Sequence, residues 1–260
     1  MSDYWMQVRR FVQFPIAILL GGFLLGAAPN DKGKDSLPLP KGESGPQADA
    51  LANRLMQATH QSAWENTKAV RWSFAGRRHH LWDRQRQLIR VRWDGNEVLR
   101  YLYPAAGQSP GRAFRDGQEV QGEAYLQLMD KAYALWVNDA FWLNPFEKLF
   151  DPGVSRSVVD SNQPPQLLMT FTSGGLTPGD SYLWEGISEG LPTAWRMWVS
   201  IIPEGGVRAT WENWQKLSTG AMVSTRHREG ERIFELGDVV GTATLEELES
   251  PDPFRLLGAL

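Results

Sequence analysis

The chain has 260 residues, of which 42% are hydrophobic and 22% are charged. This composition is that of a globular protein and excludes a mainly disordered or fibrous chain. The sequence contains no Cys, which excludes disulfides, cysteine nucleophiles, thiolate metal sites and a lipidated N-terminal cysteine. The 27 Lys and Arg against 30 Asp and Glu give a net charge of −3, so nucleic acid is not an expected partner.

An apolar run over residues 11–28 follows the basic pair Arg9 and Arg10. A basic flank, an apolar stretch and a small-residue end are typical of a secretory signal peptide or of an uncleaved signal-anchor. Cleavage at the end of the run would leave Pro29 at the next position, which favours retention of the segment. We therefore expect residues 1–28 to anchor the chain in the inner membrane and to place the rest in the periplasm.

Residues 29–47 are rich in Pro, Gly, Lys and Asp. Such a segment cannot bury enough apolar area to fold, so it predicts a flexible tether between membrane and domain. The folded part is then a single domain over residues 48–260. Its first element is predicted to be one amphipathic helix over residues 48–68, because apolar residues such as Leu51 and Leu55 recur at helical spacing.

Most of the remaining segments alternate apolar and polar residues, as half-buried strands do. The pairs Asp94-Gly95 and Asp116-Gly117 join neighbouring segments and predict tight hairpins. Short connections throughout predict antiparallel pairing, since parallel strands need long crossovers. The predicted strands are residues 70–74, 87–93, 97–103, 112–115, 118–120, 166–172, 181–185, 193–202, 207–215, 222–227 and 232–240.

A helix over residues 122–141, with an apolar stripe that contains Trp136, interrupts the strands. Asn144 followed by Pro145 predicts the start of a second, short helix. The predicted fold class is α+β: a curled antiparallel sheet of about ten strands forms a half-barrel. About three helices are expected to cover its concave apolar face, because an apolar sheet face must be buried against another layer.

The predicted order of elements resembles that of the LolA/LolB lipoprotein-carrier superfamily. This order is a helix, a strand meander, an inserted helix pair and a second strand meander. Residues 151–154 (DPGV), 176–180 (LTPGD) and 211–214 (WENW) are also similar to uncharacterised exported bacterial proteins of that neighbourhood. The resemblance covers residues 48–240 and implies a half-open barrel lidded by helices, with an apolar cavity for acyl chains. It implies no catalytic residues. These carriers are cleaved and soluble, whereas a tethered chain could not cross the periplasm alone.

Two motifs of chemically reactive residues have structural interpretations. Residues 186–190 match G-x-S-x-G, but a strand-like segment follows where a nucleophile elbow needs a helix. His79, His80 and Asp83 are metal-ligand types, but adjacent strand residues face opposite ways, so the two imidazoles diverge. We therefore expect neither a catalytic site nor a metal site, and no cofactor.

Opposite charges are concentrated in two distant stretches. Residues 68–92 carry eight bases and one acid, and residues 229–252 carry eight acids and one base. One interpretation is two solvated faces, or mutual attraction of early and late strands. The other is a basic face that meets anionic lipid headgroups, with Arg90 and Arg92 as the headgroup contacts.

The 12 Trp outnumber the 11 Phe and the 6 Tyr. Several of them fall on apolar strand faces, where aromatic side chains of this size either fill a barrel interior or line a lipid-sized cavity. The candidate cavity residues are Trp72, Phe74, Ile89, Val91, Trp93, Tyr125, Met129, Trp136, Trp195, Met197 and Trp211.

These patterns predict an extracytoplasmic, non-enzymatic domain that binds the acyl chain of a lipid or a lipoprotein. Two alternatives stay open. The chain could be a scaffold or chaperone-like partner in an envelope complex, with a filled core, or it could be a carbohydrate-binding protein or hydrolase that uses exposed Trp.

Overall fold

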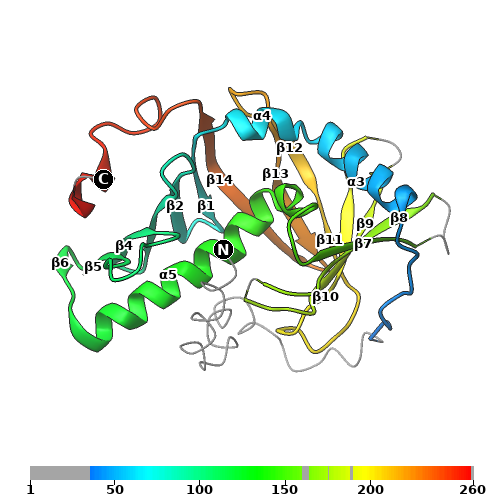
Figure 1. The fold of residues 1–260 in the computed structure, drawn as a ribbon, viewed down its shortest axis with the longest axis horizontal. Helices are drawn as coiled ribbons and strands as arrows, with labels where there is room; N and C mark the ends of the chain where they lie inside the picture. The colour runs from blue at the N-terminus through cyan, green and yellow to red at the C-terminus, as the bar shows by residue number, and fades with distance from the viewer. Residues whose placement is uncertain (1–35, 160–163, 175, 188–189, 259–260) are drawn as a thin grey trace.

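The computed structural model describes residues 36–159, 164–174, 176–187 and 190–258. It has two antiparallel sheets and few helices, which confirms the α+β class (Figure 1). One sheet has nine strands in the order β12-β13-β14-β1-β2-β3-β4-β5-β6, and the other has five in the order β11-β10-β9-β8-β7. The described part of the chain therefore holds two sheets, where the sequence predicted one.

The helices are α3 (Pro46–Ala58), α4 (Gln61–Asn66), α5 (Gly122–Leu143) and the 3-10 helices η2 (Pro145–Lys148) and η4 (Pro253–Leu257). The strands of the nine-stranded sheet are β1 (Ala69–Phe74), β2 (Arg78–Asp83), β3 (Leu88–Trp93), β4 (Asn96–Tyr101), β5 (Gly111–Arg115), β6 (Gln118–Glu119), β12 (Glu212–Lys216), β13 (Met222–Glu229) and β14 (Arg232–Thr242). The strands of the five-stranded sheet are β7 (Val154–Val159), β8 (Gln166–Phe171), β9 (Ser181–Glu185), β10 (Ala194–Trp198) and β11 (Val207–Thr210).

Both predicted Asp-Gly hairpins are confirmed. Asp94 and Gly95 connect β3 to β4 with φ angles of 43° and 75°. Asp116 and Gly117 connect β5 to β6 with φ angles of 49° and 78°. Two consecutive residues with positive φ match the twist of an antiparallel pair, which is why this dipeptide is a strong hairpin signal.

The single helix predicted over residues 48–68 is wrong, because α3 and α4 are separated at His60. This residue adopts the left-handed conformation, with φ of 54°. The Thr59 hydroxyl donates to the Leu55 carbonyl at 2.7 Å, and His60 Nδ1 lies 2.9 Å from the Gly220 carbonyl oxygen. The break depends on this contact with a distant loop, and no Pro or Gly marks it in the sequence.

The single strand predicted over residues 207–215 is also wrong, since Trp211 divides it into β11 and β12, which belong to different sheets. The Trp211 backbone amide donates to the carbonyl of Thr193, the residue directly before β10, at 2.7 Å. His227 Nδ1, on β13, lies 3.0 Å from the Thr210 carbonyl oxygen. The two sheets therefore meet where β11 runs beside β13.

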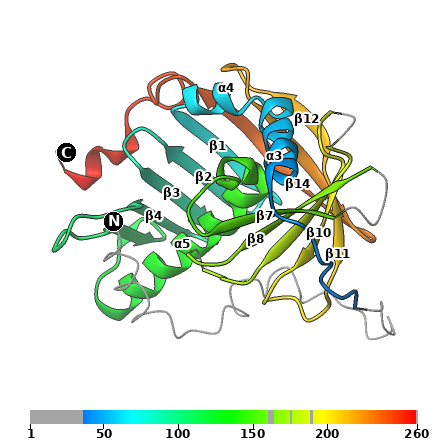
Figure 2. The ribbon, with the colours of Figure 1, turned by 45° about the vertical axis from the view of Figure 1, so that its right-hand side comes forward.

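α3 and α5 lie on the inner faces of the two sheets (Figure 2), whereas η4 lies on the outer face of the nine-stranded sheet. α5 packs against β3, β4, β5 and β13, whereas α3 packs against β7 and β8. One buried cluster lies between α5 and the nine-stranded sheet, and a second lies between α3, η2 and the five-stranded sheet. Trp142, near the end of α5, packs against both clusters, so the two form one continuous interior.

An N-terminal segment, residues 36–45, lies along the five-stranded sheet. The Leu37 amide donates to the Gly205 carbonyl at 2.9 Å, and Glu43 pairs with Val158 at the edge strand β7. This segment belongs to the predicted tether, residues 29–47, whose last two residues form the start of α3. The tether is therefore hydrogen-bonded to the sheet from residue 36 onward.

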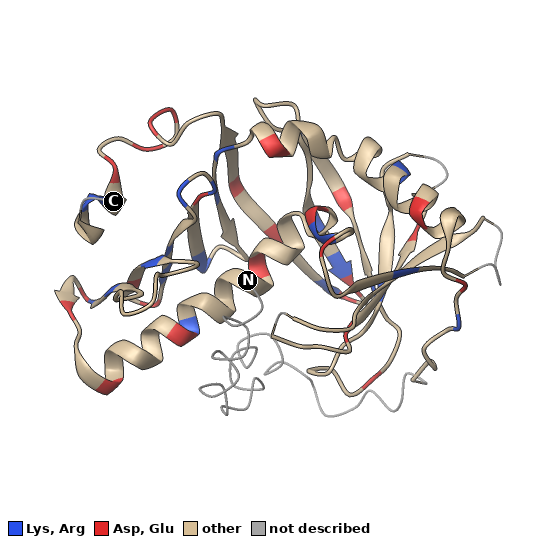
Figure 3. Cartoon of the chain, in the orientation of Figure 1, with Lys and Arg blue, Asp and Glu red and all other residues tan. Residues whose placement is uncertain are grey.

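A C-terminal segment, residues 243–257, covers the outer face of the nine-stranded sheet. Its side chains Leu245, Leu248 and Phe254 are buried against the outward-facing apolar residues of β2, β3 and β4. Figure 3 shows basic residues on these strands and acidic residues on the C-terminal segment. The Arg90–Glu249 and Arg86–Asp252 ion pairs join the two, as the predicted attraction between early and late strands requires.

Among the described helices, none combines the length and the apolar character needed to cross a membrane. The predicted membrane segment, residues 11–28, lies outside the described residues.

Candidate functional site

The predicted cavity residues lie in the interior, in the two clusters that meet at Trp142. Trp72, Phe74, Ile89, Val91, Trp93 and Met129 are buried between α5 and the nine-stranded sheet, and Tyr125 and Trp136 pack against them half-buried. Trp195, Met197 and Trp211 are buried beside the five-stranded sheet. The residues on strands point inward because every second side chain of a strand faces the same side, and Tyr125, Met129 and Trp136 lie on the apolar stripe of α5.

Trp142 is an interior residue that the sequence analysis missed. Its ring centroid lies 4.7 Å from those of Trp195 and Phe234, and 4.9 Å from that of His227. The signal was a second apolar stripe on α5, formed with Leu128 and Leu135 at a spacing of seven residues. Both stripes pack in the cluster of the nine-stranded sheet, and at the end of the helix Phe141 and Trp142 also reach the cluster of the five-stranded sheet, so one stripe does not account for all of the buried surface of α5.

Asp139 is a fully buried acid on α5, and it fastens the helix to β2. The Arg78 guanidinium donates to both of its carboxylate oxygens, at 2.8 Å and 2.7 Å. His80 Nε2 lies 2.6 Å from Asp139 Oδ2, and the Asn138 amide donates to Oδ1 at 2.8 Å. Every oxygen of the buried carboxylate is thus paired, which is the condition for a charge to be tolerated in an interior.

The sequence does contain a signal for this polar cluster. Asp139 stands seven residues after Ala132, on the buried stripe of α5, where an acid needs a partner from another element. Arg78 and His80 occupy alternate positions of β2, so they face the same side of the sheet. Sequence alone does not pair β2 with the middle of α5, so the cluster could not be identified from it.

Several buried polar atoms of the interior have no hydrogen-bond partner among the described residues. They are the indole nitrogens of Trp72, Trp82, Trp136, Trp184, Trp195 and Trp211, together with His80 Nδ1 and His227 Nε2. An unpaired buried donor costs about 1–3 kcal/mol. The six indole N–H groups in this set are hydrogen-bond donors that an oxygen atom of a guest molecule could satisfy.

His227 is enclosed by aromatic rings. Its ring centroid lies 4.6 Å from that of Trp211 and 5.2 Å from that of Phe234. Burial lowers the pKa of His227 to about 4, although the hydrogen bond to the Thr210 carbonyl opposes this shift. The imidazole is therefore neutral near pH 7, with the Nδ1 proton donated to Thr210.

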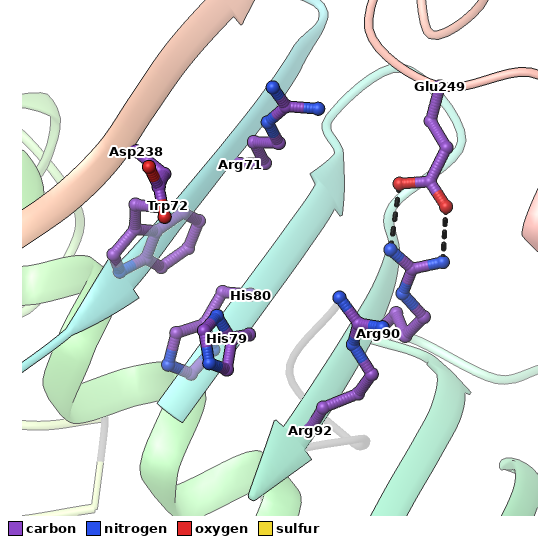
Figure 4. Close-up of a pocket in the computed structure, with 8 residues that line it drawn as sticks. All are labelled: Arg71, Trp72, His79, His80, Arg90, Arg92, Asp238 and Glu249. Atoms are coloured by element: carbon purple, nitrogen blue, oxygen red, sulfur yellow. Dashed lines mark hydrogen bonds and ion pairs between the residues drawn. The ribbon is translucent and has the colours of Figure 1, made fainter. Parts of the chain in front are cut away.

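A pocket of about 250 Å³ lies on the outer face of β1, β2 and β3 (Figure 4). It is lined by Arg71, Trp72, His79, His80, Arg90, Arg92, Asp238 and Glu249. The rings of Trp72 and His80 belong to the inner side of the sheet, where they stack at 4.6 Å. The polar rim is therefore made by the charged residues and His79.

The predicted headgroup contacts, Arg90 and Arg92, both belong to this outer pocket. Arg90 donates through Nη1 and Nη2 to the two carboxylate oxygens of Glu249, at 2.5 Å and 2.7 Å. Arg92 is exposed and has no hydrogen-bond or ion-pair partner within the described part of the chain. Both alternate along β3 with the inward-facing Val91, so they face away from the interior.

The two structural interpretations of the sequence motifs agree with the fold. His79 is exposed on the outer face and His80 is buried on the inner face, so the two imidazoles diverge. β9 and β10 pair antiparallel, so the G-x-S-x-G motif lies in a hairpin connection. Ser188 and Glu189, within the motif, lie outside the described residues.

No family model matches the chain, and no curated protein matches it. A solved structure with a similar arrangement is that of a DUF1329 family protein from Desulfovibrio piger. The two share 8% sequence identity and a TM-score of 0.40, and the match covers 80% of this chain and 96% of that chain.

Proposed function

We propose that this chain is an extracytoplasmic, non-enzymatic domain that binds the acyl chain of a lipid or lipoprotein between α5 and the inner faces of the sheets. Residues 11–28 anchor it in the inner membrane. In this proposal the two sheets form the half-barrel, and α5 with α3 forms its cover, as in the carriers of the LolA/LolB superfamily.

The observation that carries this proposal is the set of unpartnered indole N–H groups in an otherwise apolar interior. Apolar walls stabilise an acyl chain by about 0.8 kcal/mol per buried CH₂ group. The indole donors would bind the ester or amide carbonyl oxygens at the head of such a chain. The lining therefore matches an amphiphile with a long apolar part and a few hydrogen-bond acceptors.

Entry of a guest requires α5 to move, because the aromatic rings now contact one another. The Trp136 ring on α5 lies 5.0 Å from that of Trp82 on β2. Asp139 is bound by Arg78 and His80 of the same strand. This cluster holds the cover closed, so weakening it should favour the open form.

A photoreactive fatty acid tests this proposal. The full chain, in lipid nanodiscs, is mixed with the fatty acid, illuminated and digested, and the labelled peptides are identified by mass spectrometry. We expect labels on α5 and on the inner face of β1–β3. Asp139→Asn should increase the labelling several-fold, because an amide binds the Arg78 guanidinium more weakly than a carboxylate does.

Asp130→Asn is the matched control, since it removes the same charge from an exposed position of the same helix. It should leave the labelling unchanged. Thermal unfolding of each variant shows that the domain remains folded. Labels confined to residues 11–28, in the wild type and in both variants, would exclude an acyl-binding interior.

A second candidate function is a scaffold or chaperone-like partner in an envelope complex, whose core is filled. The dense aromatic packing favours it: Trp195 lies 5.0 Å from both Trp184 and Trp211, with Tyr182 at 4.8 Å. This candidate predicts no fatty-acid labelling of the interior.

The carbohydrate alternative needs an exposed aromatic platform. None of the tryptophans in the described ranges is exposed, which disfavours this alternative.

A further inference from the structure

The outer pocket holds basic side chains that the core does not require. Arg71 comes from β1, His79 from β2 and Arg92 from β3, and all three are exposed. In the sheet register His79 lies directly opposite Arg92, and opposite Ser73 on its other side. Arg71 lies opposite Leu81, two positions along β1 from Ser73. Arg71 and Arg92 therefore reach the pocket from the two strands that flank β2, with Arg92 beside the imidazole and Arg71 further along the sheet.

The C-terminal segment shows which chemistry this pocket binds. Glu249 places its carboxylate in the fork of Arg90, with both oxygens paired (Figure 4). Arg71 Nη1 donates to the carbonyl oxygen of the preceding residue, Leu248, at 3.4 Å. Oxygen atoms of the segment thus pair with both Nη atoms of Arg90, whereas Arg71 makes one long hydrogen bond to the segment.

The remaining charges favour an anion. Glu249, together with Glu97 at 3.7 Å, neutralises Arg90. The charges that remain in the pocket lining are the two positive charges of Arg71 and Arg92 and the single negative charge of Asp238. Planar guanidinium forks bind the oxygens of phosphate in pairs, and two forks from opposite sides suit a tetrahedral group better than a planar carboxylate.

The size of the pocket limits the ligand. At about 250 Å³ the pocket is smaller than the roughly 300–1,000 Å³ of pockets for drug-sized ligands, so it suits a phosphate group with a small substituent. Asp238 lies at the β14 side of the pocket, where it repels an anion. The phosphate should therefore lie toward Arg92 and His79.

We propose that this outer pocket binds a phosphate ester through Arg92, Arg71 and His79, and that Glu249 is an internal carboxylate that competes with it for Arg90. The site lies on the opposite face of the sheet from the interior. It is therefore independent of the proposed acyl-chain binding, and either proposal can fail without the other.

Calorimetric titration of the full chain, in micelles of an uncharged detergent at low salt, tests this site. The probes are inorganic phosphate, glycerol phosphate and a short-chain phosphatidylglycerol in the micelle. We expect saturable binding by the wild type, and binding weaker by about tenfold or more in Arg92→Gln, which removes a charged fork. Glu249→Gln should bind several-fold more tightly, because it frees Arg90.

Arg77→Gln is the matched control, because it removes an exposed positive charge from the β1–β2 turn outside the pocket. Its binding should equal that of the wild type. Tighter binding of glycerol phosphate supports a soluble ester as the ligand, and tighter binding of the lipid supports a headgroup. Absence of saturable binding of every probe, or an equal loss in Arg92→Gln and Arg77→Gln, would overturn the site.

Discussion

His227 is a buried imidazole that the fold keeps neutral, and this makes stability depend on pH. Its pKa falls from 6.5 to about 4 on burial, so the unfolded chain binds a proton between these values and the folded chain does not. Stability should therefore decrease as the pH falls from 6.5 toward 4, by up to about 3 kcal/mol from this residue.

Urea unfolding at pH 7 and pH 4.5 measures this dependence. His227→Gln has no titrating ring and keeps an amide that can donate to the Thr210 carbonyl. We expect the variant to lose less stability than the wild type over this interval, by about 2 kcal/mol. An identical loss in both proteins would mean that His227 is protonated in the fold.

Asp139 is a second buried residue on which the stability of the fold depends, through its charge pairing. Asp139→Leu leaves the Arg78 guanidinium in the interior without its carboxylate, and breaking such a buried pair costs about 3–5 kcal/mol. Arg78→Met combined with Asp139→Leu removes both charges and should recover most of that loss. Urea unfolding of the two variants checks this, and a double variant as unstable as the single one would contradict it.

At the scale of the element, η4 is held by a single buried aromatic residue and by an ion pair. Phe254 is buried against the outward-facing residues of the nine-stranded sheet. The hydrogen bond from Arg86 holds the pKa of Asp252 below its ordinary value. The stabilisation from this pair is therefore present above the ordinary pKa of an aspartate and is lost as the pH falls through the lowered value.

Phe254→Ala should reduce the free energy of unfolding by about 3 kcal/mol, because it removes a large side chain from a packed site. Leu256→Ala, at an exposed position of the same 3-10 helix, should change it by no more than about 0.5 kcal/mol. Chemical unfolding measures both. Equal effects would show that the C-terminal segment does not pack on the sheet as a unit.

The elements with a strong local pattern were the ones predicted well. α5 was expected over residues 122–141 and is Gly122–Leu143. β7 was not predicted, because the Ser and Arg residues of Val154–Val159 leave little contrast between its two faces. The predicted short helix after Asn144 is the 3-10 helix η2, whose cap is confirmed by the Phe146 amide donating to Asn144 Oδ1 at 3.2 Å.

At the scale of the whole molecule, the first and last segments of the described chain pack on the two sheets. Residues 36–45 lie along the five-stranded sheet, and residues 243–257 cover the outer face of the nine-stranded sheet. α3 and α5 occupy the inner faces. This arrangement places the apolar interior and the charged outer pocket on opposite faces of the nine-stranded sheet.

The sequence by itself determined the antiparallel hairpins, the inward direction of the aromatic residues and the opposite directions of Val91 and Arg92. These features depend on turn conformation and on strand alternation, which are local. Only the tertiary structure decided the break at His60, the change of sheet at Trp211 and the pairing of Asp139 with Arg78. Each of these depends on a contact between residues far apart in the chain, and such contacts leave no periodic pattern in the sequence.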